Sequence, residues 1–239
     1  PDGLAPYVGD APNVATVLDL CTGSGCLAIL LAYAYPAADV DAVDVATDAL
    51  AVAQRNVVDY GLADRINLIR SDLFANLAGK SYDLIISSES GPAKGIVPPP
   101  EALHVCYCHT PMRYIWNMYH DYRKSAGLMA RLMMPPLTHY LRMWDTTSAT
   151  RVDSFVANSA TVARRIRRYY GTDSVVIHPP VDTTAFSISA PSELEDYYLM
   201  AGELVSYKRP DLAVRAFNEM KLKLVVIGDE TSNYPSVRQ

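Results

Sequence analysis

The sequence lacks the long apolar runs, the dense cysteines and the positive charge that mark several classes of protein. No apolar run in its 239 residues approaches the roughly 18 that a membrane-spanning helix needs. Its four cysteines, Cys21, Cys26, Cys106 and Cys108, predict reduced thiols in a cytoplasmic protein. The net charge of −5 argues against a nucleic-acid partner and against a global attraction to an anionic membrane. With no membrane-spanning segment expected, peripheral contact with a membrane stays open. The oligomeric state is not predicted.

The composition changes near residue 90. Residues 1–90 hold 12 acidic and 4 basic side chains, whereas residues 91–239 hold 14 acidic and 17 basic ones. All eight methionines, all five histidines and both tryptophans lie in the second part. One domain can vary this much along its length, but the shift favours a separate interpretation of the two parts.

The first part alternates short apolar runs with helix-forming runs. We expect strands at residues 14–21, 40–45, 66–70 and 82–87, and helices at 26–35 and 47–60. Pro36 and Gly61 end the helices, and Thr47-Asp48 caps the second one. This alternation predicts an α/β Rossmann-like fold with a doubly wound, mostly parallel sheet.

Small and acidic residues follow the expected strands at the ends where such sheets bind ligands. Gly23 and Gly25 allow a ligand to approach the backbone closely. Asp44 can accept hydrogen bonds from both hydroxyls of a ribose, and Asp72 can accept one from the exocyclic amine of adenine. The pattern favours a nucleoside site, although two glycines also fit a tight turn that binds nothing.

Residues 17–32, VLDLCTGSGCLAILLA, resemble the S-adenosylmethionine-dependent glutamine methyltransferases of ribosomal protein and release factors. DAVDVATDALAVA at 41–53, GLADR at 61–65 and SDLF at 71–74 continue a resemblance that covers about residues 1–87. It implies S-adenosylmethionine as cofactor. The cofactor's methionine end would lie on Asp19, Thr22, Gly23 and Gly25, its ribose on Asp44, and its adenine on Asp72 and Leu73.

The catalytic signature of that family is missing here. The family has Asn-Pro-Pro-Tyr after its fourth strand, and this motif holds the amide of the substrate glutamine. This chain has Ser88-Glu89-Ser90-Gly91 instead. Ser88 can donate one hydrogen bond but cannot make the paired contacts of an amide, so the resemblance extends to the cofactor and not to glutamine methylation.

From residue 82 onward the chain resembles the family 4 retaining glycosyltransferases, in a subgroup that includes mannosyltransferases. The motifs are ALHVCYCHTPMRYIW at 102–116, VDSFVANS at 152–159, VARRIRRYYG at 162–171, VVIHPPVD at 175–182, GELVSYKRPDLAVRAF at 202–217 and LVVIGD at 224–229. The resemblance implies two Rossmann-like domains that face each other across a cleft (the GT-B fold). It also implies a nucleotide-sugar donor such as GDP-mannose and no metal.

The glycosyltransferase resemblance assigns five site residues. His109 is the catalytic candidate beside the reacting sugar, with Thr110 next to it and Arg113 on the acceptor side. Lys208 and Arg209 would face the donor diphosphate, where cations offset the charge that develops on the leaving group.

The two resemblances meet at residues 82–90 and predict a chimera, whether natural, engineered or an artefact that joins two genes. Its segments would be a methyltransferase-like half at 1–87, a glycosyltransferase N-domain remainder at 88–190, and the start of the C-terminal domain at 191–239. Pro1-Asp2-Gly3 lacks an initiator Met, and the sequence stops soon after Gly228-Asp229, so we expect a fragment. Three functions stay open: a cofactor-binding module, a glycosyltransferase active only with its missing donor domain, and a fusion without function.

Simpler interpretations accompany several of these residues. His109 also fits a strand-end histidine without a catalytic role. Cys106, Cys108 and His109 lack an evident fourth metal ligand. Arg164, Arg165, Arg167 and Arg168 fit a solvated helix face. Met129, Met133 and Met134 have the spacing of core contacts, and Pro135-Pro136 should break or kink their helix.

Overall fold

The computed structural model of the chain describes residues 14–185, 187, 190, 195–205 and 208–228. The chain divides into two compact units, Pro1–Pro180 and Val181–Gln239. The expected segments 1–87 and 191–239 extend beyond the described residues at 1–13 and 229–239, among others.

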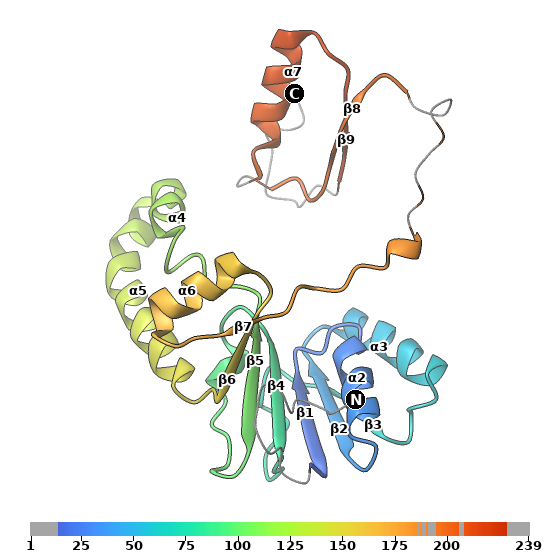
Figure 1. Cartoon of the computed structure of the whole chain (residues 1–239). Coiled ribbons are helices and arrows are strands. Elements are labelled where there is room, and N and C mark those ends of the chain that lie inside the picture. The colour runs from blue at the N-terminus through green and yellow to red at the C-terminus, as the bar shows by residue number, and fades with distance from the viewer. Residues whose placement is uncertain (1–13, 186, 188–189, 191–194, 206–207, 229–239) are drawn as a thin grey trace. The chain divides into compact units, whose positions relative to one another are not determined.

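The first unit is built on a seven-stranded sheet whose paired strands are all parallel (Figure 1). The strands are β1 (Thr16–Leu20), β2 (Asp39–Asp44), β3 (Ile66–Arg70), β4 (Leu84–Glu89), β5 (Leu103–Cys108), β6 (Ser154–Ala157) and β7 (Val175–Val176), in the order β3-β2-β1-β4-β5-β6-β7. The expected Rossmann-like α/β fold is confirmed. Strand β4 pairs with both β1 and β5, so the sheet continues without interruption across residues 82–90.

Helices connect most of these strands. They are α2 (Cys26–Ala34), α3 (Thr47–Asp59), α4 (Tyr119–Ser125), α5 (Leu128–Ala149) and α6 (Ala160–Tyr170), with short 3-10 turns η1 (Ala93–Gly95) and η2 (Thr183–Ala185). The expected cap of α3 at Thr47-Asp48 is wrong. Ala46 is the N-cap, and its amide donates to Asp44 Oδ1 at 2.9 Å because the carboxylate reaches two residues along the chain.

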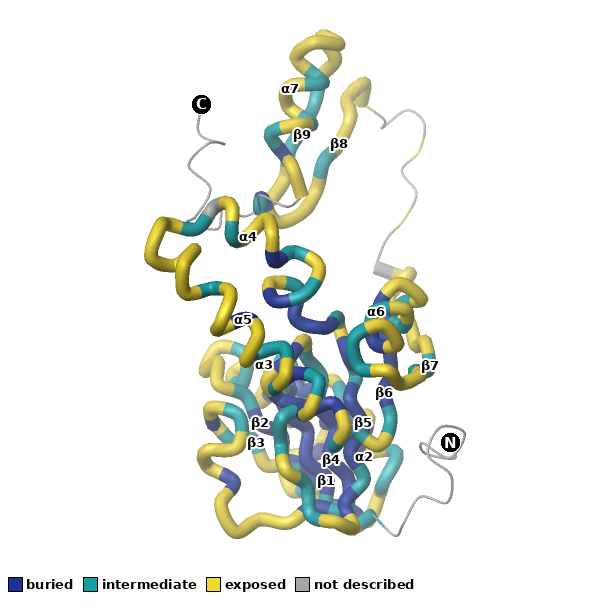
Figure 2. The backbone as a smooth tube through the Cα atoms, turned by 90° about the vertical axis from the view of Figure 1, so that its left-hand side faces the viewer, coloured by how far each residue is buried: buried dark blue, intermediate teal, exposed yellow. Residues whose placement is uncertain are grey.

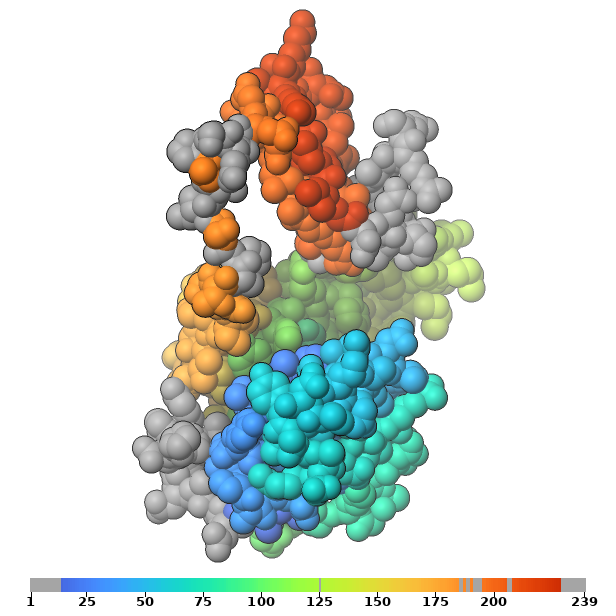
Figure 3. All heavy atoms as spheres, turned by 90° about the vertical axis from the view of Figure 1, so that its right-hand side faces the viewer, coloured from blue at the N-terminus to red at the C-terminus, as the bar shows by residue number. Residues whose placement is uncertain are grey.

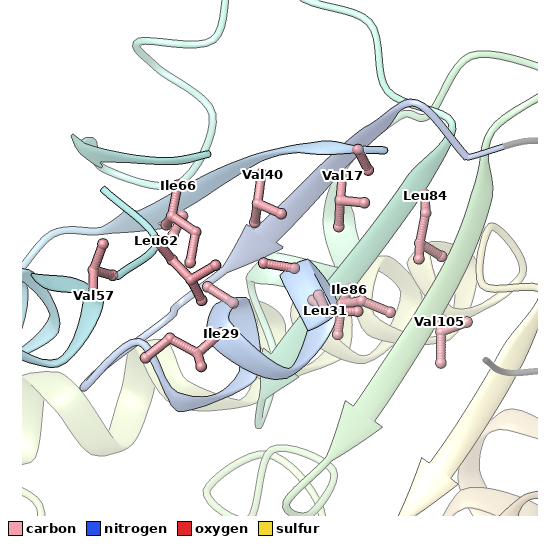
Figure 4. Packing of buried hydrophobic residues seen from close by; sticks show 14 of the residues in the cluster. Val17, Ile29, Leu31, Val40, Val57, Leu62, Ile66, Leu84, Ile86 and Val105 are labelled. Carbon is pink, nitrogen blue, oxygen red and sulfur yellow. The ribbon is translucent and has the colours of Figure 1, made fainter. Parts of the chain in front are cut away.

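The core of the first unit follows the alternation of its strands. One cluster joins Val17, Leu84 and Val105 of the sheet with Ile29 and Leu31 of α2 (Figure 4). Two further clusters contain the residues next to these along the strands, among them Leu18, Ile85 and Cys106. Figure 3 shows the blue-to-cyan residues that include α2 and α3 as one continuous surface. The first cluster draws side chains from both sides of residue 87, so the two parts share a core.

Helix α5 differs from the expectation in two ways. It continues through Pro135 and Pro136 instead of breaking there. Neither proline can donate to the carbonyl four residues earlier, on Arg131 or Leu132, but both of those residues are exposed and water can satisfy their carbonyls. Met129 and Met133 are 73% and 58% exposed, so their expected role in the core is wrong.

The second unit contains a parallel pair of strands, β8 (Tyr198–Ala201) and β9 (Leu224–Ile227), joined through α7 (Pro210–Met220). Tyr198 and Phe217 contact each other edge to face, with ring centroids 5.1 Å apart, and so join β8 to α7. Across the described part of both units, no helix combines the length and apolarity needed to cross a bilayer.

Candidate functional site

The glycine turn after β1 lies where the strand order reverses. Strand β1 has β2 on one side and β4 on the other, and ligands of doubly wound sheets bind at this switch point. Cys21, Gly23 and Gly25 all adopt positive φ, at 64°, 58° and 79°. A Cβ on Gly25 would lie 3.1 Å from Ala53 Cβ, whereas one on Gly23 would meet open space. Gly25 therefore lets α2 approach α3, and Gly23 leaves the backbone open to a ligand.

The carboxylate of Asp44 fixes the turn. Its Oδ2 accepts from the amide of Gly23 at 2.9 Å, and its Oδ1 accepts from the amide of Ala46 at the same distance. Asn56 holds the turn from α3, since its Nδ2 donates to the carbonyl of Ser24 at 2.8 Å. The structure thus brings the expected ribose ligand, Asp44, into contact with the expected glycine turn.

Asp19 lies beneath the turn and is fully buried. Its Oδ2 accepts from the hydroxyl of Thr22 at 2.6 Å, while its Oδ1 accepts no hydrogen bond of ordinary geometry. Burial raises the pKa of Asp19 to about 6, with the nearby charge of Asp44 adding to the rise and Thr22 and the Ala28 amide opposing it. Asp19 supports the turn from below and leaves one acceptor without a partner there.

The residues after β3 complete this edge of the sheet. Asp72 is exposed, and Leu73 adopts a positive φ of 50° and packs against the core. Together with Cys21, Asp44 and Ser71 they line a hollow of about 50 Å³. This hollow has room for only a few waters, so a nucleobase would lie over it and not inside it. Another hollow, of about 560 Å³, lies beside the first residues of β2 and β3, away from the glycine turn.

The ends of β4 and β5 bring a second set of expected residues together. His109 is exposed, and its Nε2 lies 3.1 Å from Ser88 Oγ, within hydrogen-bond distance. Glu89 turns back instead, because its Oε1 accepts from the amides of Ala93 at 2.8 Å and Lys94 at 3.4 Å. Burial raises the pKa of Glu89 above its ordinary range. Glu89 lies in the segment that replaces the glutamine clamp, and its carboxylate is therefore engaged by backbone amides of the same part of the chain.

The remaining expected residues are divided between the two units. Thr110 accepts from Arg165 at 2.9 Å, so Arg165 joins this edge and is not simply a solvated arginine of α6. Arg113 donates to Met118 Sδ. Lys208 and Arg209 belong to the second unit, where Arg209 makes two hydrogen bonds with Asp211, at 2.9 and 3.0 Å. This contact lowers the pKa of Asp211 to about 2.

Cys21 lies at the site and was missing from the sequence-based assignment. Burial, with the negative charges of Glu89, Asp44 and Asp19, raises its pKa to about 12, so its thiol stays protonated near neutrality. In the sequence it is the last residue of the expected first strand, directly before the glycine turn, and that position was the signal available. No group of three or more His, Cys, Asp or Glu within the described residues is arranged to hold a metal ion.

Comparison with known proteins places similarity in the same part of the chain. Residues 8–89 match the methyltransferase small domain family. The ribosomal protein uL3 glutamine methyltransferase of Bordetella pertussis is 58% identical over 85 residues, which cover 36% of this chain and 28% of that protein. The Neisseria meningitidis serogroup A protein of the same name is 59% identical over 87 residues, again 36% and 28%.

The solved structure of a ribosomal protein L11 methylase from Lactobacillus delbrueckii subsp. bulgaricus is 30% identical in sequence to the matched part of this chain. The match covers 34% of this chain and 39% of the methylase chain, with a TM-score of 0.30. The chain thus spans under a third of the length of the two uL3 glutamine methyltransferases that it matches. The family match ends at residue 89, the last residue of β4.

Proposed function

We propose that the first part of the chain, residues 1–87, binds S-adenosylmethionine at the ends of β1, β2 and β3. The contact of Asp44 with the amides of Gly23 and Ala46 carries this proposal. It holds a carboxylate beside an open glycine turn, at the reversal point of a parallel sheet. The identity of 58% to a uL3 glutamine methyltransferase over this part supports the same assignment.

Each expected residue has a place in this proposal. The carboxylate of Asp44 has lone pairs beyond its two amide contacts, and these would accept hydrogen bonds from the ribose hydroxyls. Exposed Asp72, with Leu73, would hold the adenine. Gly23 and Gly25 would let the methionine end lie on the turn, above Thr22 and Asp19. The amine of the methionine end is positively charged. It would suit this site, because the described partners of Asp19 and Asp44 are backbone amides and a hydroxyl. The bound cofactor would supply a transferable methyl group.

Cofactor binding does not extend to glutamine methylation in this proposal. The relatives are named for a glutamine of uL3, but in this chain the segment after β4 lacks an amide clamp, and Glu89 is engaged by Ala93 and Lys94. The partners we propose are small-molecule ligands. A cytoplasmic location, with the four cysteines as free thiols, belongs to the same proposal.

Calorimetric titration with S-adenosylhomocysteine tests the proposal. We expect saturable binding that Asp44→Ala weakens by at least about tenfold, since each hydrogen bond to a charged group contributes about 1.5–3 kcal/mol. Asp48→Ala removes the same charge from an exposed position on α3 and should leave affinity unchanged. Circular dichroism confirms that each variant is folded. Absence of heat from a folded wild-type chain would contradict the proposal.

We propose a nucleotide-sugar site in the second unit as a second candidate function. Lys208 and Arg209 lie between β8 and the first turn of α7, and Lys208 Nζ is 3.7 Å from where a Cβ of Gly202 would stand. Cations between a strand and a helix N-terminus favour phosphate. The assignment of residues 88–190 and 191–239 to the two glycosyltransferase domains belongs to this proposal, and so do the roles expected for His109, Thr110 and Arg113.

Titration with GDP-mannose tests this second candidate. Binding should fall in Lys208→Ala and persist in Lys223→Ala, which removes a 63%-exposed lysine of the same unit. A folded chain that gives no heat with either ligand is a fusion of two parents without a binding function of its own.

A further inference from the structure

The outer face of α5 carries a row of large apolar side chains that the first unit leaves exposed. Figure 2 shows the first half of α5 almost entirely in the colour of exposed residues. The residues of this outer face are between 50% and 84% exposed: Leu128, Met129, Leu132, Met133, Leu137, Tyr140 and Met143. At 100° per residue they fall within one half of the helix surface.

The opposite face of α5 is the one that packs, and it is mostly polar. Its buried residues are Thr138, Asp145, Ser148 and Ala149. Asp145 forms an ion pair with the ammonium of Lys94, and its Oδ2 accepts from Trp116 Nε1 at 2.7 Å. Polar contacts thus fix the helix in this orientation and turn its apolar side outward, the reverse of an ordinary surface helix.

Basic side chains gather at the N-terminal end of α5, next to the end of α4. His120, Arg123, Lys124 and Arg131 line a hollow of about 330 Å³. The guanidinium of Arg131 donates to the carbonyls of Arg123 at 3.3 Å and Lys124 at 3.0 Å, which holds the end of α4 against the start of α5. Residues 113–143 contain five basic side chains and one acidic, Asp121, a balance of +4 in a chain of net charge −5.

We propose that the outer face of α5, with this basic cluster, docks on the surface of an anionic lipid bilayer. An exposed apolar helix face beside clustered cations matches the two layers of such a surface, acyl chains and anionic headgroups. A second copy of this chain fits less well, because pairing the same face would bring two segments of charge +4 together. Leu128, Leu132 and Met133 enter the acyl boundary, and Arg123 and Lys124 meet the headgroups.

Co-sedimentation of the full chain with lipid vesicles tests this proposal. One set of vesicles contains only phosphatidylcholine, and the other contains equimolar phosphatidylcholine and phosphatidylglycerol. We expect binding to the anionic set that weakens as salt is raised. The double variant Leu132→Glu, Met133→Glu should weaken it by about tenfold or more, and Lys124→Gln by about fivefold. Val58→Glu, at a 57%-exposed position of α3, adds the same kind of charge elsewhere and should change nothing.

Three results would overturn the proposal. The first is a folded wild-type chain that binds neither vesicle. The second is equal binding to both vesicle sets, which would show that the basic cluster does not contribute to binding. The third is a wild-type dimer, seen by light scattering, that becomes monomeric in the double variant while neither protein binds vesicles. That last outcome would assign the outer face of α5 to a second copy of the chain.

Discussion

The two parts of the sheet stabilise their carboxylates in different ways. Near β1 and β2, the described partners of Asp19 and Asp44 are a hydroxyl and backbone amides. In the second part, Asp145 of α5 instead pairs with the ammonium of Lys94. It also accepts hydrogen bonds from the indole N–H of Trp116 and from the hydroxyl of Tyr170, the latter at 3.1 Å.

This difference distinguishes a ligand-binding site from a contact that holds the fold together. Carboxylates whose described partners are amides and a hydroxyl have no cation opposite them, which suits a ligand with an amine and hydroxyls. A carboxylate neutralised by a buried lysine has no such capacity, and its role is to fix α5 on the sheet. Burial alone does not distinguish these roles; the chemical nature of the partners does.

The largest expected effect comes from breaking the ion pair of the second part. Lys94 and Asp145 are both almost fully buried, so Lys94→Met leaves an uncompensated buried charge. We expect a loss of about 3–5 kcal/mol in the free energy of unfolding, measured by urea denaturation.

Lys80→Met is the matched control from the first part. Lys80 also pairs with an aspartate, Asp41, but its side chain is 40% exposed. Tyr82 and Asn67 still donate to Asp41 in this variant, so the loss should stay below about 1 kcal/mol. Equal losses in the two variants would contradict the distinction between a buried and a solvated pair.

His104 of the second part predicts a loss of stability in acid. Its ring is buried, with Nε2 2.9 Å from Ser87 Oγ, and desolvation lowers its pKa from 6.5 to about 4. The unfolded chain binds the proton more readily, so this contribution is complete above pH 6.5 and is lost as pH falls toward 4, up to about 3 kcal/mol. Urea titrations across this range should give a shallower profile for His104→Gln; an unchanged profile would contradict it.

Asp19 of the first part predicts the opposite slope. Its pKa of about 6 in the folded chain lies above the ordinary 3.8. The folded state therefore binds the proton more readily, and this contribution to stability is lost as pH rises from 3.8 through 6, by about 2–3 kcal/mol. Asp19→Asn should remove this slope and leave that of His104. A variant that keeps the wild-type profile would show that Asp19 ionises normally.

The smallest effect separates two glycines with similar backbone. Gly25→Ala forces a side chain into φ +79° and within 3.1 Å of Ala53, whereas Gly171→Ala at φ +73° meets open space. Each should lose about 1–2 kcal/mol for the left-handed conformation, and Gly25→Ala should lose about 1 kcal/mol more. Thermal unfolding of the two variants measures the difference, and a larger loss at Gly171 would contradict it.

Local patterns predicted most of the fold correctly. Strand β3 has the expected bounds, 66–70, since a short apolar run flanked by polar residues fits little else. Helix α5 was misjudged because the spacing of Met129 and Met133 is the same whether that face points inward or outward. Its orientation depends on the pairing of Asp145 with Lys94, 51 residues away along the chain, which a local pattern does not contain.

The site was only partly predictable for a similar reason. Asp44 and Gly23 follow neighbouring strands, so parallel topology alone brings them together. The turning of Glu89 toward Ala93 and Lys94, and the contact of Arg165 with Thr110, depend on the course of loops after β4 and β5. The assignments of cofactor and substrate residues stay predictions until a ligand is bound.

The most direct test of the account is a titration of ¹⁵N-labelled protein with S-adenosylhomocysteine, followed by amide NMR shifts. We expect the amide resonances of Gly23, Ala46 and Asp72 to shift together and to saturate with a single affinity, while the amide resonance of Gly171 does not move. Shifts confined to other regions, or none in a spectrum of a folded chain, would contradict a cofactor site at the ends of β1, β2 and β3.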